Sequence, residues 1–332
     1  MNTVATAAHD QVLAELREAD KLLLTTHENP DGDALGSLLA THLILEQLGK
    51  DSVMYMSPDE FPLPWEYRSF QFEGLVGTAP DDVAERTIVF LDCGNIDRMP
   101  VDFLRQDGLH VLNIDHHHDN TRFGTVNLVV GDASCTAEIV YDLAKDLGAD
   151  ITPPIADALY VALVTDTGRF MYENTTPAAH LMAAELIQVG VAPHDVYRRL
   201  YEDLPFSRLE LLSHALSSVE RHDDGAITVG HLTKRDFEET GAVETDSEGI
   251  VDHMRAVEGT AVAVLVRELL ADERAGMRKV SLRATDGRVD VSRIARQMGG
   301  GGHRQAAGFT TELPYDELLA TLREQIAAQL HE

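Results

Sequence analysis

Short apolar runs alternate with longer helical patterns between residue 20 and about residue 190. Strand-length runs such as KLLLTT, TIVFLD, HVLNID and VNLVV are separated by segments such as ALGSLLATHLILEQLG, which is long enough for a helix. This alternation is typical of a mainly parallel sheet flanked by helices. A second series, AITVGHL, TAVAVLVREL and RKVSLRAT followed by DVSRIARQMG and a helix from Pro314, predicts a smaller α/β domain with a mixed sheet. We therefore expect an α/β protein of two domains.

The boundary between the two patterns lies in a helical segment that is interrupted at Pro205. We predict a larger N-terminal domain over residues 1–190, a helical connector over residues 191–216 and a smaller domain over residues 217–332. A cleft between the two domains is expected to hold the ligand.

The charge of the chain limits its partners. Its 332 residues include 56 Asp and Glu against 27 Lys and Arg, which gives a formal net charge of −29. Binding to long nucleic acid depends on many cationic contacts, so we expect no long nucleic acid as a partner. Short or small anionic substrates stay possible.

The cysteines and the apolar runs predict the location of the protein. Cys93 and Cys135 cannot supply a disulfide framework, and the start MNTVATAAHDQ lacks a basic-then-apolar signal pattern. No apolar run approaches the roughly 18–20 residues that a membrane helix needs. We expect a cytoplasmic protein with no membrane partner, in which both cysteines are small buried residues rather than nucleophiles.

Metal-competent side chains directly follow three of the apolar runs. KLLLTT leads into HENPDGD, TIVFLD ends on Asp92, and HVLNID leads into three histidines, while the run ALYVALVTD, expected to be helical, ends on Asp166. Taken singly, Asp31 and Asp33 could be turn and N-cap residues, Asp92 could be an acid at the start of a loop, and His116 could be an ordinary polar side chain with satisfied hydrogen bonds. Carboxylates gathered at one sheet edge, however, repel one another unless a cation neutralises them.

The types of ligand indicate which cation would bind. Carboxylates mixed with imidazoles, without a thiolate cluster, suit Mn²⁺, with Fe, Co and Zn as competitors. Two ions about 3.5–4 Å apart are the usual device for hydrolysing phosphoesters, and that spacing requires one bridging acid. The sequence therefore predicts two divalent metal ions, with Mn²⁺ as the first choice.

The same segments resemble a known family. HENPDGD, LDCGN, DHHH and TDTGRF resemble the four ordered motifs of the DHH phosphoesterases, and SLRA with DVSRIARQMGGGGHRQAAGF resembles their DHH-associated C-terminal domain. The resemblance covers nearly the whole chain, and its two-domain plan looks most like the stand-alone oligoribonuclease and 3′-phosphoadenosine 5′-phosphate phosphatase branch. It implies a metal-binding catalytic first domain, a substrate-binding second domain and a homodimer.

The resemblance further implies two sets of metal ligands that share Asp92 as the bridging acid. The first set is His27, Asp31 and Asp92. The second set is Asp33, Asp92, His116 and Asp166.

Two residues of the DHHH motif receive catalytic roles from the resemblance. Asp115 would orient the ligand His116, since a ligating imidazole is usually fixed by a partner. His117 would face the scissile phosphate as a hydrogen-bond donor or acid. His118 lies beyond the motif and receives no role.

The glycine run MGGGGHR belongs to the second domain. It lacks the Lys-Ser/Thr ending of a Walker A loop and introduces no dinucleotide-binding fingerprint. It could be a flexible turn, or its backbone N–H groups could approach an anion, which the family match favours. Between residues 278 and 304 seven Lys or Arg stand against two Asp, and the planar fork of Arg suits a terminal phosphate. The predicted substrate-binding residues are Arg283, Gly300, Gly301, Gly302 and His303.

The resemblance implies a two-metal phosphoesterase that hydrolyses short oligoribonucleotides to nucleoside monophosphates and 3′-phosphoadenosine 5′-phosphate to AMP. A phosphodiesterase for cyclic or linear dinucleotides, such as c-di-AMP or pGpG, needs the same metal ions and is the alternative. A manganese pyrophosphatase and a RecJ-type exonuclease fit less well, because the basic Ser-Arg-Lys signature and the added nucleic-acid-binding modules are not found. A nucleotide-binding regulator without catalysis is the alternative from another class, although intact acids in all four motifs argue against it.

Overall fold

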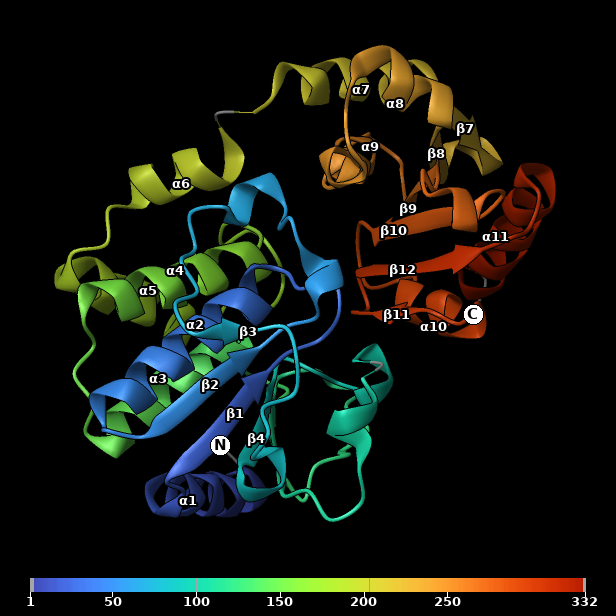
Figure 1. Ribbon diagram of the computed structural model, residues 1–332. Coiled ribbons are helices and arrows are strands. Elements are labelled where there is room, and N and C mark those ends of the chain that lie inside the picture. Colours follow the sequence, from blue (N-terminus) through green and yellow to red (C-terminus); the bar gives the residue numbers. More distant parts are fainter. Residues whose placement is uncertain (1–2, 100, 203, 331–332) are drawn as a thin grey trace. The chain divides into compact units, whose positions relative to one another are not determined.

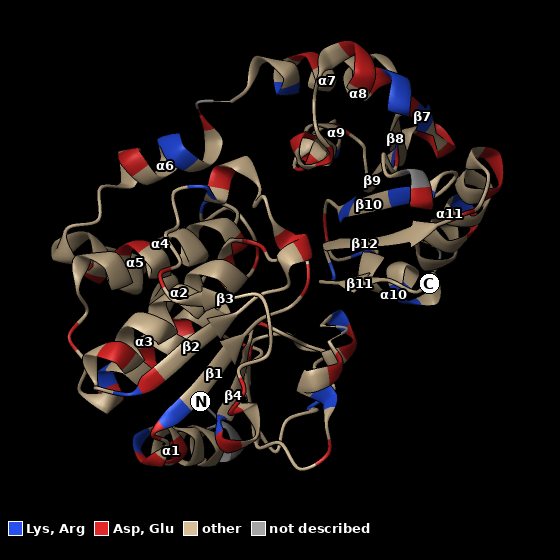
Figure 2. Ribbon diagram, in the orientation of Figure 1, with Lys and Arg blue, Asp and Glu red and all other residues tan. Residues whose placement is uncertain are grey.

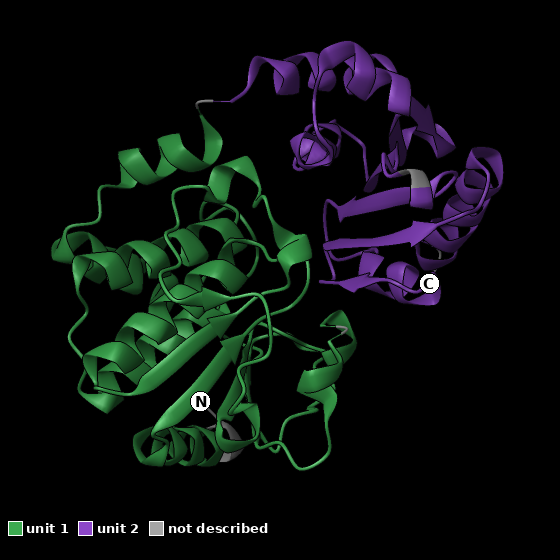
Figure 3. Ribbon diagram, in the orientation of Figure 1, with its two compact units in different colours: residues 1–202 green, residues 203–332 purple. Residues whose placement is uncertain are grey.

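The computed structural model describes residues 3–99, 101–202 and 204–330, which form two compact units, residues 1–202 and residues 203–332 (Figure 3). Each unit is built on a six-stranded sheet with helices packed against it (Figure 1). The division falls inside the segment 191–216: helix α6 (Pro193–Tyr201) belongs to the first unit and helix α7 (Phe206–Ser217) to the second.

The sheet of the first unit is parallel throughout, in the order β3-β2-β1-β4-β5-β6. Its strands are β1 (Lys21–Thr25), β2 (Asp51–Tyr55), β3 (Leu75–Val76), β4 (Thr87–Leu91), β5 (Val111–Asp115) and β6 (Val126–Val129). The prediction of a parallel sheet in this part is confirmed. The strand order reverses between β1 and β4, and in such sheets ligands bind outside the carboxyl ends of the strands at that reversal.

Helices cover one face of this sheet. Leu22 and Leu24 of β1 point into a core formed with α2 (Gly32–Gln47), α3 (Thr136–Leu147) and α4 (Pro153–Asp166). Helix α1 (Thr3–Glu18) packs beside β6, and α5 (Pro177–Val189) packs on α4. On the opposite face Leu23 packs against residues of the loops and short 3₁₀ turns between 96 and 105, so this face lacks a long helix among the described residues.

A close contact between α2 and α4 brings the two helix ends that carry Asp33 and Asp166 together. A Cβ atom on Gly36 would lie 2.4 Å from the backbone oxygen of Ala158 and 2.8 Å from the Cβ of Ala162. Only a glycine leaves room for helices at this distance. Gly36 of the motif GDALGS therefore allows the close approach of the two helices.

The second unit contains a mixed sheet in the order β11-β12-β10-β9-β8-β7, as expected, in which only β8 and β9 run parallel. Its strands are β7 (Glu220–His222), β8 (Ile227–Leu232), β9 (Val262–Glu268), β10 (Arg278–Ala284), β11 (Gly301–Gly302) and β12 (Ala306–Thr311). One face packs on α10 (Val291–Gln297) and α11 (Tyr315–Leu330). The other packs on α7, α8 (Lys234–Thr240) and α9 (Ile250–Arg255). No described helix is both long and apolar enough to cross a membrane.

Candidate active site

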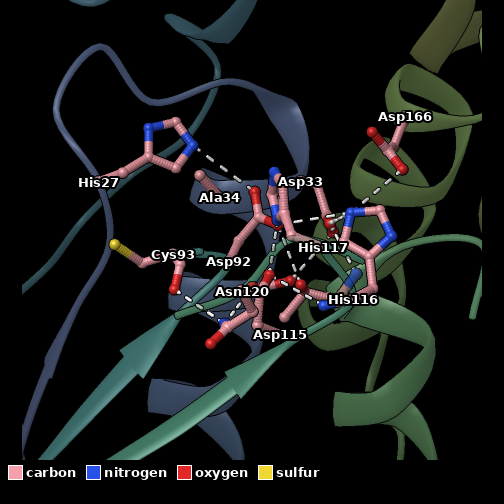
Figure 4. Close-up of polar contacts among 12 residues, drawn as sticks. His27, Asp33, Ala34, Asp92, Cys93, Asp115, His116, His117, Asn120 and Asp166 are labelled. Carbon is pink, nitrogen blue, oxygen red and sulfur yellow. Dashed lines mark hydrogen bonds and ion pairs between the residues drawn. The ribbon is translucent and has the colours of Figure 1, made fainter. Parts of the chain in front are cut away.

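The metal-competent side chains of the first unit gather where three adjacent strands end (Figure 4). His27 follows β1, Asp92 follows β4, and Asp115 closes β5 ahead of His116 and His117. Because the strands are parallel, all these ends lie at one edge of the sheet. The structure thus brings together residues that are up to 90 positions apart in the sequence, at the reversal of strand order.

Asp92 lies at the centre of the cluster. Its Oδ2 is 3.6 Å from Nε2 of His27, and its Oδ1 is 3.6 Å from Nε2 of His116. The carboxylate is 2% exposed, and the Asp92 backbone is left-handed, with φ of 57°, a conformation that Asp adopts more readily than most residues. This turn directs the side chain between His27 and the DHHH segment.

Three groups of side chains that share Asp92 have ligand atoms close enough for a metal ion, all within 4.8 Å of one another. Two of them consist only of predicted metal ligands: the first group is His27, Asp31 and Asp92, and the second group is Asp33, Asp92 and His116. The remaining one is Asp92, Asp115 and His117. Asp166 adjoins the second group, since its Oδ2 lies 3.6 Å from Nε2 of His116 (Figure 4). Every predicted metal ligand is therefore in or next to one of the two groups.

The N-terminus of α3 holds two of these carboxylates. The backbone N–H groups of Thr136 and Ala137 donate to Asp33 over 2.7 and 3.0 Å, and the Thr136 hydroxyl donates to Asp92 over 3.0 Å. Ser37 adds a hydroxyl hydrogen bond to Asp33 of 3.1 Å. Unpaired N–H groups and the helix dipole make a helix start favourable for carboxylates. Asp33 is thus fixed in place by main-chain donors.

Asp31 has a structural role besides its place in the first group. It is the N-cap of α2, where its Oδ1 accepts from the backbone N–H groups of Asp33 and Ala34, both over 3.1 Å. The possibility that Asp31 is an N-cap is therefore correct. Only one oxygen is used in this way, so the cap and a ligand role are compatible.

Crowding of buried charge shifts the pKa values in the cluster. Burial, Asp33 and other nearby acids raise the pKa of Asp92 well above its usual range, and burial raises the pKa of Asp166 to about 8. Burial also lowers the pKa of His27 to about 3, which keeps its imidazole neutral. For His116 the neighbouring Asp166 and Asp33 outweigh burial and raise the pKa.

These residues fit divalent metal ions. Ligands bonded about 2.1 Å from one ion lie roughly 3.0–3.5 Å apart, and Nε2 of His116 lies 3.6–3.8 Å from oxygens of Asp33, Asp92 and Asp166. That separation is too long for a direct hydrogen bond. Cations would also favour ionised carboxylates, which otherwise hold protons because they repel one another. The neutral imidazole of His27 is the form that coordinates a metal.

Asp115 and His117 form a hydrogen-bonded pair beside the metal ligands. Asp115 Oδ1 accepts from Nδ1 of His117 over 2.7 Å, and Asp115 Oδ2 accepts from the Asn120 amide over 2.5 Å. Asp115 was expected to orient the ring of His116, but its hydrogen bond to His116 is from the backbone N–H, over 2.9 Å, while Nδ1 of the His116 ring lies 3.4 Å from the carbonyl of Ala133. Asp115 therefore orients His117.

The surroundings of Asp115 keep its carboxylate ionised. Burial alone would raise the pKa of Asp115, but the charge of His117 and hydrogen bonds from His117 and Asn120 bring it below its usual range. A carboxylate that accepts from Nδ1 of an imidazole fixes the plane of the ring and the direction in which Nε2 points. The orientation of His117 is therefore set by Asp115 and Asn120.

The predicted substrate-binding residues all belong to the second unit. Nε of Arg283 lies 3.6 Å from Asp252, and the residues around His303 form a tight turn in which its N–H donates to Ala306 O over 2.7 Å. A Cβ on Gly300 would lie 2.1 Å from the carbonyl oxygen of Gly308, and one on Gly302 would lie 2.5 Å from Ala306 O. The need for glycine at these two positions thus has a packing explanation. Gly301 has open space around it, so packing does not explain that glycine.

The remaining candidates take no part in the cluster. Both cysteines are buried, and burial raises the pKa of Cys93 to about 12 and that of Cys135 well above its usual range, which makes both thiols poor nucleophiles. His118 is exposed at the surface.

Sequence reasoning missed several residues that contact the cluster, among them Arg98, Asn120 and Thr136. Thr136 could have been noticed, because a Ser/Thr-rich stretch before an apolar run, here SCTAEI, is a signal for a helix start. Asn120 follows the DHHH motif without any periodic pattern. Arg98 lies six residues after Asp92, where only the fold brings it to His27, 2.9 Å away.

A buried cluster of carboxylates and imidazoles at the strand ends of a parallel α/β sheet defines a metal-dependent hydrolase. The DHH family, N-terminal domain, matches residues 21–163, and the DHHA1 domain matches residues 229–332. The chain is 35% identical over 326 residues to the bifunctional oligoribonuclease and PAP phosphatase NrnA of Thermus thermophilus, covering 95% of this chain and 94% of that protein. The chain therefore belongs to the DHH phosphoesterase family.

Two further comparisons agree. A bifunctional oligoribonuclease and PAP phosphatase NrnA of Bacillus subtilis is 27% identical over 293 residues, covering 87% of this chain and 88% of that protein. The crystal structure of an exopolyphosphatase-related protein from Bacteroides fragilis superimposes with a TM-score of 0.85 at 25% identity, covering 100% of both chains. The relation thus extends over both units.

Proposed function

We propose that the protein is a two-metal phosphoesterase that hydrolyses short oligoribonucleotides to nucleoside monophosphates and 3′-phosphoadenosine 5′-phosphate to AMP. The observation that carries the proposal is that Asp92 belongs both to the group with His27 and Asp31 and to the group with Asp33 and His116. A carboxylate shared by two ions is the arrangement that two-metal phosphoester hydrolysis requires. The relation to the Thermus thermophilus enzyme, over nearly the full length of both proteins, supports the substrates.

We assign His27, Asp31 and Asp92 to one ion and Asp33, Asp92, His116 and Asp166 to the other. Mn²⁺ suits this mixture of carboxylates and imidazoles. When bound, the ions supply Lewis acidity that activates water and neutralises charge on the phosphate oxygens. The chain itself fixes Asp33 through α3 and directs Asp92 through its left-handed backbone.

His117 acts on the scissile phosphate in this proposal. Asp115 accepts a hydrogen bond from Nδ1 of His117, which orients the ring, and Asn120 keeps Asp115 in position. Nε2 is then the atom that would give or receive a proton at the leaving or attacking oxygen. A positioned imidazole of this kind is a common proton donor or acceptor in catalysis.

The second unit would bind the phosphate that is not cleaved, through Arg283, Gly300, Gly301, Gly302 and His303. The support is the resemblance of these segments to the DHHA1 domain, which matches residues 229–332. The planar guanidinium of Arg283 suits a terminal phosphate. Alanine at Arg283 and His303 should raise KM for substrates with a terminal phosphate and leave the metal content unchanged.

The charge of the molecule favours short substrates. Acidic residues are spread over the helices and loops of both units (Figure 2), in keeping with the formal net charge of −29. A long polyanion would gain few cationic contacts on such a surface and would be repelled by it. Long nucleic acid is accordingly not proposed as a substrate.

Products from a substrate panel test this function. The Mn²⁺-loaded protein is incubated with 3′-phosphoadenosine 5′-phosphate, RNA dimers to 10-mers, pGpG, c-di-AMP and pyrophosphate. AMP from the first and nucleoside monophosphates from the short RNAs are expected. Cleavage of c-di-AMP or pGpG alone would instead make the protein a dinucleotide phosphodiesterase, and no turnover with Mn²⁺, Mg²⁺, Co²⁺ or Zn²⁺ would make it a nucleotide-binding regulator.

We also propose a cytoplasmic homodimer. The dimer rests on the family resemblance, and the cytoplasmic location on two buried thiols that form no disulfide. Light scattering at twice the mass of the chain would support the dimer, and the mass of a single chain at micromolar concentration would contradict it.

A further inference from the structure

Arg98 lies beside the proposed metal ligands, although no motif points to it. It closes the 3₁₀ turn Ile96–Arg98 that follows β4, and its carbonyl accepts from the N–H of Glu28 over 2.7 Å. Its Nη2 donates to Nδ1 of His27 over 2.9 Å. The loops after β1 and β4 are thereby joined, and a cation is held next to the Asp92 cluster.

The hydrogen bond from Arg98 conflicts with a second one at the same atom. Nδ1 of His27 also lies 2.7 Å from the carbonyl oxygen of Glu28, to which it can donate only if it carries the proton. A guanidinium is a donor only, so Nδ1 accepts from Arg98 only when it lacks that proton. One nitrogen cannot do both, and the two contacts therefore exclude each other.

The ligand role of His27 decides between the two contacts. Nε2 of His27 faces Asp92 at 3.6 Å and is the nitrogen available to an ion. A neutral imidazole that coordinates through Nε2 carries its proton on Nδ1, and a ligating histidine commonly donates that proton to a backbone carbonyl. Nδ1 then donates to Glu28, and the Arg98 guanidinium loses its acceptor.

Arg98 forms no close ion pair within the described part of the chain, although its charge helps to lower the pKa of Asp31. Among the residues that the structure describes, no carboxylate oxygen lies within 4.0 Å of its guanidinium nitrogens, whereas Arg105 in the same loop pairs with Asp97 at 3.2 Å. The chain has a net charge of −29, so an arginine without an ion pair is unusual in it. Arg98 lies beside the proposed site of phosphate hydrolysis, and its guanidinium has N–H donors that an anion could use.

We propose that Arg98 is an anion-binding residue of the active site, which donates to an oxygen of the phosphoryl group of the substrate. The proposal rests on the proposed function, because the anion is the phosphate that the metal site would cleave. Guanidinium groups stabilise charge on phosphoryl oxygens through hydrogen bonds of this kind. In the absence of phosphate the guanidinium contacts Nδ1 of His27. When phosphate is present, the guanidinium leaves that contact and donates to the phosphate oxygen instead.

Two titrations by calorimetry separate this role from a role in holding His27. Mn²⁺ is titrated first, and AMP and inorganic phosphate are then titrated into the Mn²⁺-loaded protein. Arg98→Met is expected to weaken AMP and phosphate binding by about 10–100-fold, the range for a lost hydrogen bond to a charged group. Its Mn²⁺ affinity should stay within threefold of wild type or rise, since a cation beside the ions has been removed. Arg98→Lys should recover part of the anion affinity.

The matched control is Arg17→Met, which removes one positive charge from the exposed surface of α1, where Arg17 donates to the carbonyl of Asp146. It should leave both affinities unchanged. Unaltered phosphate binding in Arg98→Met, or a tenfold loss of Mn²⁺ affinity, would overturn the inference. Failure of the wild-type protein to bind Mn²⁺ would instead overturn the proposed function, so the two failures can be told apart.

Discussion

The backbone N–H of Thr136 donates to Asp33 across 103 residues of sequence, over 2.7 Å, while the Thr136 hydroxyl donates to Asp92 over 3.0 Å. One residue at the start of α3 thus fixes an acid from α2 and the acid that follows β4. Thr136 is fully buried, so water cannot substitute for its hydrogen bonds. It is a positioning residue for the proposed ligands of the second ion.

Thr136→Val keeps the shape of the side chain and removes the hydroxyl. We predict that this change weakens Mn²⁺ binding by about 10–100-fold, the usual effect of losing a partner that orients a metal ligand. Thr136→Ser should bind Mn²⁺ as wild type does. The control is Thr25→Val, which removes another buried hydroxyl of the same unit, one that bonds the carbonyl of Tyr55. Equal Mn²⁺ affinities in Thr136→Val and wild type would contradict the role.

The sequence predicted the side chains of the cluster better than the residues that hold those side chains in place. His27, Asp92 and His116 follow apolar runs, and the parallel order of those runs is enough to place them at one edge. Thr136 and Arg98 reach the cluster through contacts between segments far apart in the chain, and no local periodicity encodes such contacts. Which histidine ring Asp115 orients depends on the backbone geometry at the end of β5, and the spacing of the motif alone does not show it.

The sequence likewise predicted some strands and helices of the fold and missed others. Strands with strong apolar runs, such as β4, were predicted from their pattern, but β2, with the sequence DSVMY, and β3, of two residues, were not. Helix α1 was not predicted either, because its sequence is polar and its apolar stripe is narrow. Short or weakly apolar elements gain their stability from tertiary packing, which a local pattern cannot show.

Without metal ions the protein should lose stability as pH rises from 7.0 to 8.5. Asp166, with a pKa of about 8, holds a proton in the folded state that it releases in the unfolded state, where its pKa is 3.8. His116, whose pKa is also raised, acts in the same direction. The folded state therefore binds more protons than the unfolded state, and the free energy of unfolding falls with pH, by about 1 kcal/mol for Asp166 alone.

Melting temperatures in EDTA at the two pH values test this prediction. The lowered pKa of His27, about 3, opposes it only weakly, because His27 is largely neutral in both states above pH 7. Saturating Mn²⁺ should make the melting temperature nearly independent of pH. In EDTA, Asp166→Asn should make the fall of the melting temperature with pH smaller than in wild type. A metal-free protein whose melting temperature is constant or rises over this range would show that the carboxylates are not protonated in the fold.

His117→Ala should lower kcat by about 10²–10⁴, the usual loss for a positioned proton donor or acceptor, with metal content near wild type. Asp115→Asn should lower kcat as well, because Asp115 accepts from Nδ1 of His117 and sets its orientation. Since Asp92, Asp115 and His117 also form a metal-competent group, metal analysis of both variants is the decisive control. Loss of an ion from His117→Ala would make His117 a ligand.

Catalytic efficiency should peak at about 2–5 nucleotides of RNA and fall for longer strands. The chain carries 56 acidic against 27 basic residues, so each added phosphate without a cationic contact is repelled. The fall should be steepest at low salt, where screening is weakest. A kinetic series from dimer to 24-mer at two ionic strengths measures this, and efficiency that climbs with length would indicate a processive exonuclease.

The central claim is that Asp92 bridges two metal ions, since its oxygens lie 3.6 Å from both His27 and His116. Anomalous diffraction at the manganese edge, from crystals grown with Mn²⁺, tests it most directly. We predict two peaks about 3.5–4 Å apart with the Asp92 carboxylate between them. In Asp92→Asn crystals at the same Mn²⁺ concentration, at least one peak should be lost. A single peak in the wild-type protein, or two peaks of which only one contacts Asp92, would contradict the account.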